Sequence, residues 1–147
     1  MILLKTLKEV IAINIKEMNL GDIASFSKTV SEADIYLFAG ITGDLNPAHI
    51  DENTASKTRF KGRIAHGILS AGFISAVIGM QLPGPGSIYL GQELKFVKPV
   101  KIGDTVKAVC TVIDINIEKN IIQLDTKCYN QENTVVVEGT ATVMPPK

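Results

Sequence analysis

The chain has 147 residues, of which 46% are hydrophobic and 20% are charged, and its 15 Lys and Arg residues balance its 15 Asp and Glu residues. This length and composition predict one globular domain with a sizeable core. Because the net charge is zero and no basic run occurs, electrostatics gives no support for a nucleic-acid partner.

The N-terminal residues predict an extension followed by the domain itself. Residues 1–20 carry interspersed charges and lack the small-residue cleavage site of a secretory signal. We therefore treat them as an N-terminal extension without assigned structure, before a single domain over residues 21–147. Within that domain, residues 24–30 predict a first strand.

A short helix is predicted directly after this strand. Ser31 supplies a capping hydroxyl, and acidic residues follow in the first turn, where they suit the helix dipole. We expect the helix to run to about residue 39, with Gly40 and Gly43 helping to end it.

A polar segment over residues 43–61 separates this helix from a much longer one. Asn46-Pro47 indicates a turn, and residues 51–57 predict one or two helical turns. The long helix is predicted over residues 64–82, with apolar residues all around its axis. Such a helix has to be enclosed by something large, and a curved sheet is the obvious partner.

Residues 64–92 contain no charged side chain and are numerous enough to span a bilayer. Three features favour a buried helix without a membrane partner. His66 and Ser70 lie within the stretch, the segment PGPGS interrupts it, and the chain contains no second span.

The last part of the chain alternates apolar and polar residues with period two, which predicts strands. The short turns between them predict an antiparallel meander. The predicted strands cover residues 87–97, 105–117, 121–129 and 134–143. The fold class is therefore α+β, an antiparallel sheet wrapped around a long central helix. A single sheet of this kind leaves an edge strand uncovered, and edge-to-edge pairing of two copies would relieve that.

The two cysteines, Cys110 and Cys128, have no Cys or His partner at metal-ligand spacing. We expect two small buried side chains with free thiols, as in a reducing, cytoplasmic compartment.

The stretch GDLNPAHID, residues 43–51, is either a polar turn or a reaction centre. Asp44 alone is typical of a turn, where its carboxylate accepts backbone N–H groups, and His49 alone is more often structural. Together, across a turn stiffened by Pro47, the two side chains can converge on one water as an acid/base pair.

The start of the long helix offers a second candidate. The first N–H groups of a helix have no internal partner, so the backbone at Gly67 could bind a developing oxyanion. The alternative, equally weighted, is that Gly67 permits tight packing of helix on sheet. Ser70 and Ser75 follow on the same helix, outside any nucleophile elbow, and their default role is a hydroxyl bonded to a carbonyl one turn earlier.

These residues carry a family resemblance. D-L-N-P-A-H at residues 44–49 and A-H-G-I-L-S at residues 65–70 resemble the hydratase motif of the MaoC-like family, most closely that of the (R)-specific enoyl-CoA hydratases. S-I-Y-L-G-Q at residues 87–92 and F-V-K-P-V-K-I-G-D at residues 96–104 extend the resemblance, which covers residues 21–143. It implies a hotdog fold and a homodimer. Whether such dimers assemble further is left open.

The resemblance also implies an activity and assigns residues to it. The reaction would be the reversible syn addition of water to trans-2-enoyl-CoA, giving (R)-3-hydroxyacyl-CoA, as in a hydro-lyase. Asp44 and His49 match the pair that activates one water, Gly67 matches the glycine whose N–H polarises the thioester carbonyl, and Ser75 matches an active-site serine. No metal and no cofactor are implied, and the acyl-CoA thioester is the substrate.

Three other functions stay open at this point. The nearest is dehydration of 3-hydroxyacyl thioesters of acyl carrier protein in fatty-acid synthesis. The second is an acyl-CoA thioesterase. Thioesterases of this fold typically use a carboxylate on or beside the central helix, and residues 64–92 contain none. The third is a non-catalytic acyl-CoA binder. The sequence specifies neither the acyl chain length nor the direction of the reaction.

Overall fold

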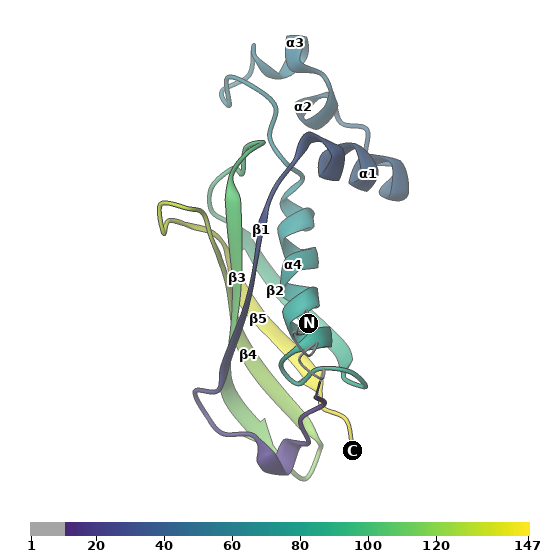
Figure 1. Ribbon diagram of the computed structural model, residues 1–147, viewed down its shortest axis with the longest axis vertical. Helices are drawn as coiled ribbons and strands as arrows, with labels where there is room; N and C mark the ends of the chain where they lie inside the picture. Colours follow the sequence, from purple (N-terminus) through teal and green to yellow (C-terminus); the bar gives the residue numbers. More distant parts are fainter. Residues whose placement is uncertain (1–10) are drawn as a thin grey trace, which may run out of the picture.

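One long helix packs against one face of a five-stranded antiparallel sheet in the computed structural model, which describes residues 11–147 (Figure 1). The elements in chain order are η1 Ile15–Glu17, β1 Ile23–Thr29, α1 Glu32–Thr42, α2 Pro47–Ile50, α3 Glu52–Ala55, α4 Gly67–Met80, β2 Ile88–Phe96, β3 Thr105–Asn116, β4 Ile121–Tyr129 and β5 Val135–Met144. This is the hotdog arrangement, and the predicted α+β class is confirmed.

The sheet has the strand order β1-β3-β4-β5-β2. The predicted meander is confirmed, since β3 pairs with β4 and β4 pairs with β5, both antiparallel. Asn120 and Asn133, in the two connecting turns, take positive φ angles of 53° and 59°, a conformation that Asn tolerates better than most residues. β1 and β2 form the two edges of the sheet.

The core lies between α4 and the sheet. Alternate residues of β4 and of the first part of β3 are fully buried, which is the period-two pattern of strands with one face on a core. In β5 the alternation is interrupted, since Val136 and Val137 are both buried. Phe73, Ile74 and Val77 of α4 pack into the same cluster. The predicted free, buried cysteines are confirmed, and burial raises the pKa of the Cys110 and Cys128 thiols to about 12.

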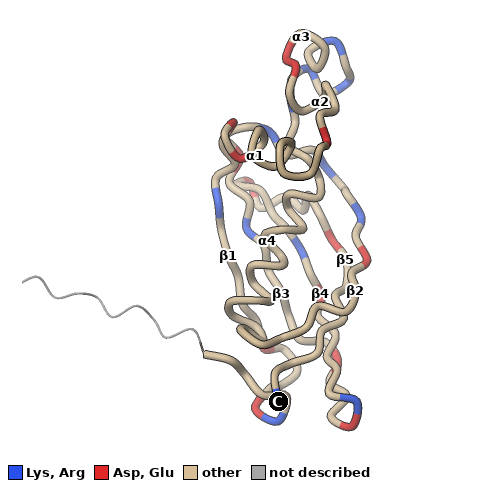
Figure 2. The backbone as a smooth tube through the Cα atoms, turned by 90° about the vertical axis from the view of Figure 1, so that its right-hand side faces the viewer, with Lys and Arg blue, Asp and Glu red and all other residues tan. Residues whose placement is uncertain are grey.

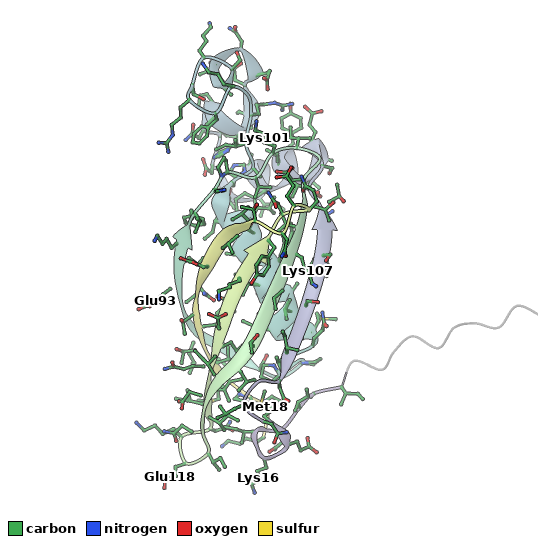
Figure 3. All side chains as sticks on the ribbon, turned by 90° about the vertical axis from the view of Figure 1, so that its left-hand side faces the viewer. Lys16, Met18, Glu93, Lys101, Lys107 and Glu118 are labelled. Carbon is green, nitrogen blue, oxygen red and sulfur yellow. The ribbon has the colours of Figure 1, made fainter. Side chains whose placement is uncertain are left out.

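The sheet's other face carries charged side chains, including the labelled Glu93 and Lys107 of Figure 3, and no helix in the described part of the chain covers it. Among residues 11–147, no helix has both the length and the apolar character needed to cross a membrane.

The described part of the N-terminal extension contributes to this same core. Ile15 and Met18 are buried in it, and the Ile13 N–H donates to the Pro83 carbonyl at 2.8 Å. The remainder of the predicted extension, residues 1–10, lies outside the described residues.

Helix α1 begins as predicted and ends later. The Ser31 hydroxyl accepts from the Asp34 N–H while the Asp34 carboxylate accepts from the Ser31 N–H, a complete capping box. Gly40 lies inside the helix, which continues to Thr42. Gly43 ends it alone, because its φ of 80° places it in the left-handed region and its N–H donates to the Ala39 carbonyl at 2.9 Å.

Helix α4 starts three residues later than its apolar pattern predicts. The Ile64 N–H donates to the Ala48 carbonyl at 3.1 Å, and the Ala65 N–H donates to the Val100 carbonyl at 2.7 Å. These two bonds hold the backbone in an extended bridge that pairs Ile64 with Lys101. The first helical residue is therefore Gly67.

The expectation that α4 is enclosed on all sides is wrong for a single chain. Ile68 and Met80 are 51% and 54% exposed, and Ser75 between them is exposed as well. The sheet covers only one side of the helix, so the opposite side stays open.

Candidate active site

A cavity of about 430 Å³ lies at the N-terminal end of α4. The segment of α1, α2 and α3 forms a cap beyond the end of the sheet, directly above this helix end (Figures 1 and 2). Asp44, His49 and His66 line the cavity from the cap side, Gly67 lies at the helix start, and the chain leaving β2 at Phe96 closes another wall.

The loop that carries Asp44 is organised by short-range hydrogen bonds. The Asp44 carboxylate accepts from the Asn46 N–H at 3.2 Å, and the Asn46 side chain accepts from the Ala48 N–H at 3.0 Å. Pro47 occupies the first helical position after this cap, where its missing N–H is not needed. The expected irregular turn is thus the start of the short helix α2, which carries His49.

The orientation of His49 follows from one contact. Its Nδ1 lies 2.7 Å from the Ile64 carbonyl oxygen. A carbonyl oxygen only accepts, so Nδ1–H donates, and Nε2 of the neutral ring is left with a free lone pair. His49 can therefore accept a proton inside the cavity.

His66 is a site residue that the sequence did not assign. The residue is 2% exposed, and the centroid of its ring lies 3.9 Å from that of His49 and 4.7 Å from that of Phe38. Its Nε2–H donates to the Asp44 main-chain carbonyl at 3.0 Å. In the sequence it stood directly before Gly67 in the motif A-H-G-I-L-S, but nothing in the spacing links residue 66 to residue 44.

The side-chain groups of Asp44, His49 and His66 converge. One nitrogen or carboxylate oxygen from each lies within 4.8 Å of the others. Two acceptors at such a separation can share one water at ordinary hydrogen-bond lengths. The structure therefore brings Asp44 and His49 together, and their joint action on one water stays a prediction.

The same cluster offers three groups that could ligate a metal ion, but the donor geometry suits it poorly. A ligating imidazole nitrogen has to be unprotonated, whereas the Nε2–H of His66 is engaged with the Asp44 carbonyl. The two imidazole planes are inclined by only 33°, so their in-plane lone pairs run side by side rather than toward one point.

The surroundings of Gly67 are compatible with both interpretations offered for it. Its N–H is the first of α4, the His66 side chain makes no capping bond, and no acceptor for this N–H is found within residues 11–147. A Cβ at this position would also lie 2.6 Å from the Phe96 ring. The residue is therefore small for packing, and its backbone is open to a ligand.

Ser75 is the predicted site residue that a single chain does not bring to the cavity. It lies on the exposed side of α4, two turns beyond Ile68, which does line the cavity. Ser70, in contrast, lines the cavity and is buried.

Arg63 ties two helices of the cap to each other, another contribution that the sequence did not reveal. Its guanidinium contacts Glu32 and donates to the Tyr36 hydroxyl at 2.9 Å in α1, and its Nε lies 3.4 Å from the Glu52 carboxylate in α3. Hydrogen bonding to Arg63 lowers the pKa of Glu32. The clamp fixes α1 and α3 on either side of the loop that carries Asp44 and His49.

Comparison with known proteins adds an independent finding. Residues 21–137 match the sequence profile described as "MaoC like domain". The chain is 56% identical over 131 residues to an (R)-specific enoyl-CoA hydratase of Rhodospirillum rubrum, a match that covers 89% of this chain and 90% of the relative. It is 40% identical over 141 residues to a 3-hydroxybutyryl-CoA dehydratase of Methylorubrum extorquens, covering 96% and 89%. An R-hydratase structure from Pseudomonas aeruginosa, in the unliganded form, superposes with a TM-score of 0.87 at 44% identity, covering 92% of this chain and 87% of that one.

Proposed function

Because the chain belongs to the MaoC-like domain family, we propose that it is an (R)-specific enoyl-CoA hydratase, a hydro-lyase that adds water reversibly to trans-2-enoyl-CoA and gives (R)-3-hydroxyacyl-CoA. The observation that carries this proposal is the meeting of Asp44, His49 and the Gly67 N–H in one cavity.

Water activation is assigned to Asp44 and His49. The carboxylate and the free Nε2 are both acceptors, so together they hold the two hydrogens of one water, and a lone pair of its oxygen faces the substrate. One acceptor removes a proton as the oxygen attacks C3. That proton then goes to C2 from the same face, so the addition is syn.

The Gly67 N–H is assigned to the thioester carbonyl. Attack at C3 moves negative charge onto the carbonyl oxygen, where an enolate develops. A helix N-terminus carries unsatisfied N–H groups and a partial positive charge, so it stabilises this enolate more than the uncharged substrate. This step needs no metal or redox group.

The cavity wall suits a thioester with a phosphorylated carrier. Ile64, Val100 and Val137 supply apolar surface, and Arg59 and Lys98 supply cations. Coenzyme A and acyl carrier protein both present phosphate, so the carrier has to be decided by assay. The cytoplasmic location stays a prediction from the sequence, in keeping with the two free thiols.

The assignment of the pair predicts the kinetics of three variants with crotonyl-CoA as substrate. Asp44→Asn keeps the size of the side chain but removes the basic oxygen, and His49→Ala removes the other acceptor. Each is expected to lower kcat by ~10²–10⁴-fold, the usual contribution of a positioned acid/base group. Since the two groups act on one water, the double variant is expected to be little worse than the poorer single variant.

These rates are measured as loss of the conjugated-enoyl absorbance, with thermal unfolding confirming that each variant folds. The wild-type protein is also given the same acyl group on acyl carrier protein, and preference for that carrier would favour the dehydratase of fatty-acid synthesis. Full hydratase activity in a folded single variant would reject the assignment. So would a double variant whose loss equals the product of the two single losses.

A homodimer is proposed to cover the surfaces that one chain leaves open. The outer side of α4 and the edge strand β2, with Ile88 and Leu90 54% and 48% exposed, are apolar surfaces of the kind that association buries. Sedimentation at micromolar concentration is expected to give twice the 15.8 kDa mass of the chain or a multiple of that dimer. A monomer would contradict this proposal.

Ser75 remains proposed as a residue that meets the acyl chain, on the open side of α4 and in line with Ile68. Ser75→Leu is expected to change the ratio of rates for crotonyl-CoA and trans-2-octenoyl-CoA more than it changes thermal stability. Ser27→Leu, at an exposed position of β1, is the matched control and is expected to leave the ratio unaltered. If Ser75→Leu keeps the wild-type ratio, or unfolds the protein, Ser75 belongs to the packing instead.

A further inference from the structure

We propose that His66 is a positioning residue, whose Nε2–H bond to the Asp44 carbonyl sets the distance between the catalytic carboxylate and the Gly67 N–H. This inference rests on the proposed function, in which Asp44 and the Gly67 N–H act on the two ends of one enoyl group. It assigns a task to a buried imidazole that the chemistry above does not use.

The loop around Asp44 needs such an anchor. The Asp44 side chain is 49% exposed. Apart from His66, the hydrogen-bond partners of this residue within residues 11–147 are the Thr42 hydroxyl and the Asn46 N–H, both two residues away. Local bonds shape the turn but do not relate it to the rest of the protein. The His66 bond spans 22 positions in the chain and joins the turn to α4.

His66 is itself rigidly held. The side chain is 1% exposed, and its ring is packed against Phe38 and His49. The residue is also covalently joined to Gly67, the first residue of α4. One side chain therefore contacts both members of the proposed pair, and its backbone leads into the N–H assigned to the thioester carbonyl.

The hydrogen-bonding pattern of the ring indicates a donor rather than a proton carrier. Nε2–H is used on a carbonyl, and Nδ1 is buried with no hydrogen-bond partner among residues 11–147. Buried polar groups are nearly always paired, so an unpaired one indicates a site where function overrides packing.

Two substitutions separate the hydrogen bond from the stacking. His66→Gln places an amide N–H at about the reach of Nε2 but removes the ring. His66→Phe keeps a ring between Phe38 and His49 but removes the donor. His66→Asn is a polar control, since its amide ends at the depth of Nδ1 and is too short to reach the Asp44 carbonyl.

A misplacement of about 1 Å can lower a rate by about 10²-fold. His66→Phe and His66→Asn are therefore expected to lower kcat with crotonyl-CoA by roughly 10–100-fold and to change KM by less than about threefold. For His66→Gln, kcat and KM are each expected to stay within about threefold of the wild-type values. Hydrogen exchange of the peptide covering residues 43–50 gives a second readout that does not depend on activity. Exchange is expected to accelerate in the Phe and Asn variants and to stay slow in the Gln variant.

The two readouts distinguish failure of this proposal from failure of the proposed function. A wild-type protein that hydrates no enoyl thioester rejects the function, and hydrogen exchange still decides the role of His66. Wild-type kcat and slow exchange in His66→Phe would overturn the positioning role and assign the ring to packing. Equal loss in the Gln and Phe variants would overturn it as well. If His66→Phe does not fold, the comparison of Asn with Gln carries the test.

Discussion

The position at which α4 begins is the constraint on which the rest of the site depends. Two backbone bonds, from Ile64 to the Ala48 carbonyl and from Ala65 to the Val100 carbonyl, keep residues 64 and 65 out of the helix. If the helix began at residue 64, the Gly67 N–H would lie one turn inside it. Because it begins at Gly67, its first N–H groups stay open and face a cavity, where a partial positive charge is available.

The same two bonds bring the proposed acid/base pair to this helix end. The Ala48 carbonyl belongs to α2, the short helix that carries His49, and the Ile64 carbonyl in turn accepts from the His49 ring. The loop and the helix start are thereby tied together by contacts in both directions. The site therefore forms where the loop of residues 43–51 meets the start of α4, and neither segment forms it alone.

The sequence was a good guide wherever structure depends on neighbouring residues. Period-two alternation located the strands, and the Ser31 cap located the start of α1, because strand pleating and helix capping are local. The start of α4 was placed too early, since Ile64 and Ala65 fit a helical pattern and only distant carbonyls exclude them. His66 and Arg63 were missed for the same reason, as their partners lie 22 and 31 positions away in the chain. Asp44 and His49 could be proposed as a pair from the sequence because both lie in one short turn.

The proposed mechanism delivers water and proton to one face of the double bond from groups that share one cavity. Hydration of crotonyl-CoA in D₂O tests this most directly, with the coupling between the C2 and C3 protons of the product measured by NMR. We expect a single diastereomer with one deuterium at C2, added on the same face as the hydroxyl at an (R) C3. An anti product, or a mixture of both diastereomers at early conversion, would contradict the claim, because a single Asp44–His49 pair cannot reach both faces.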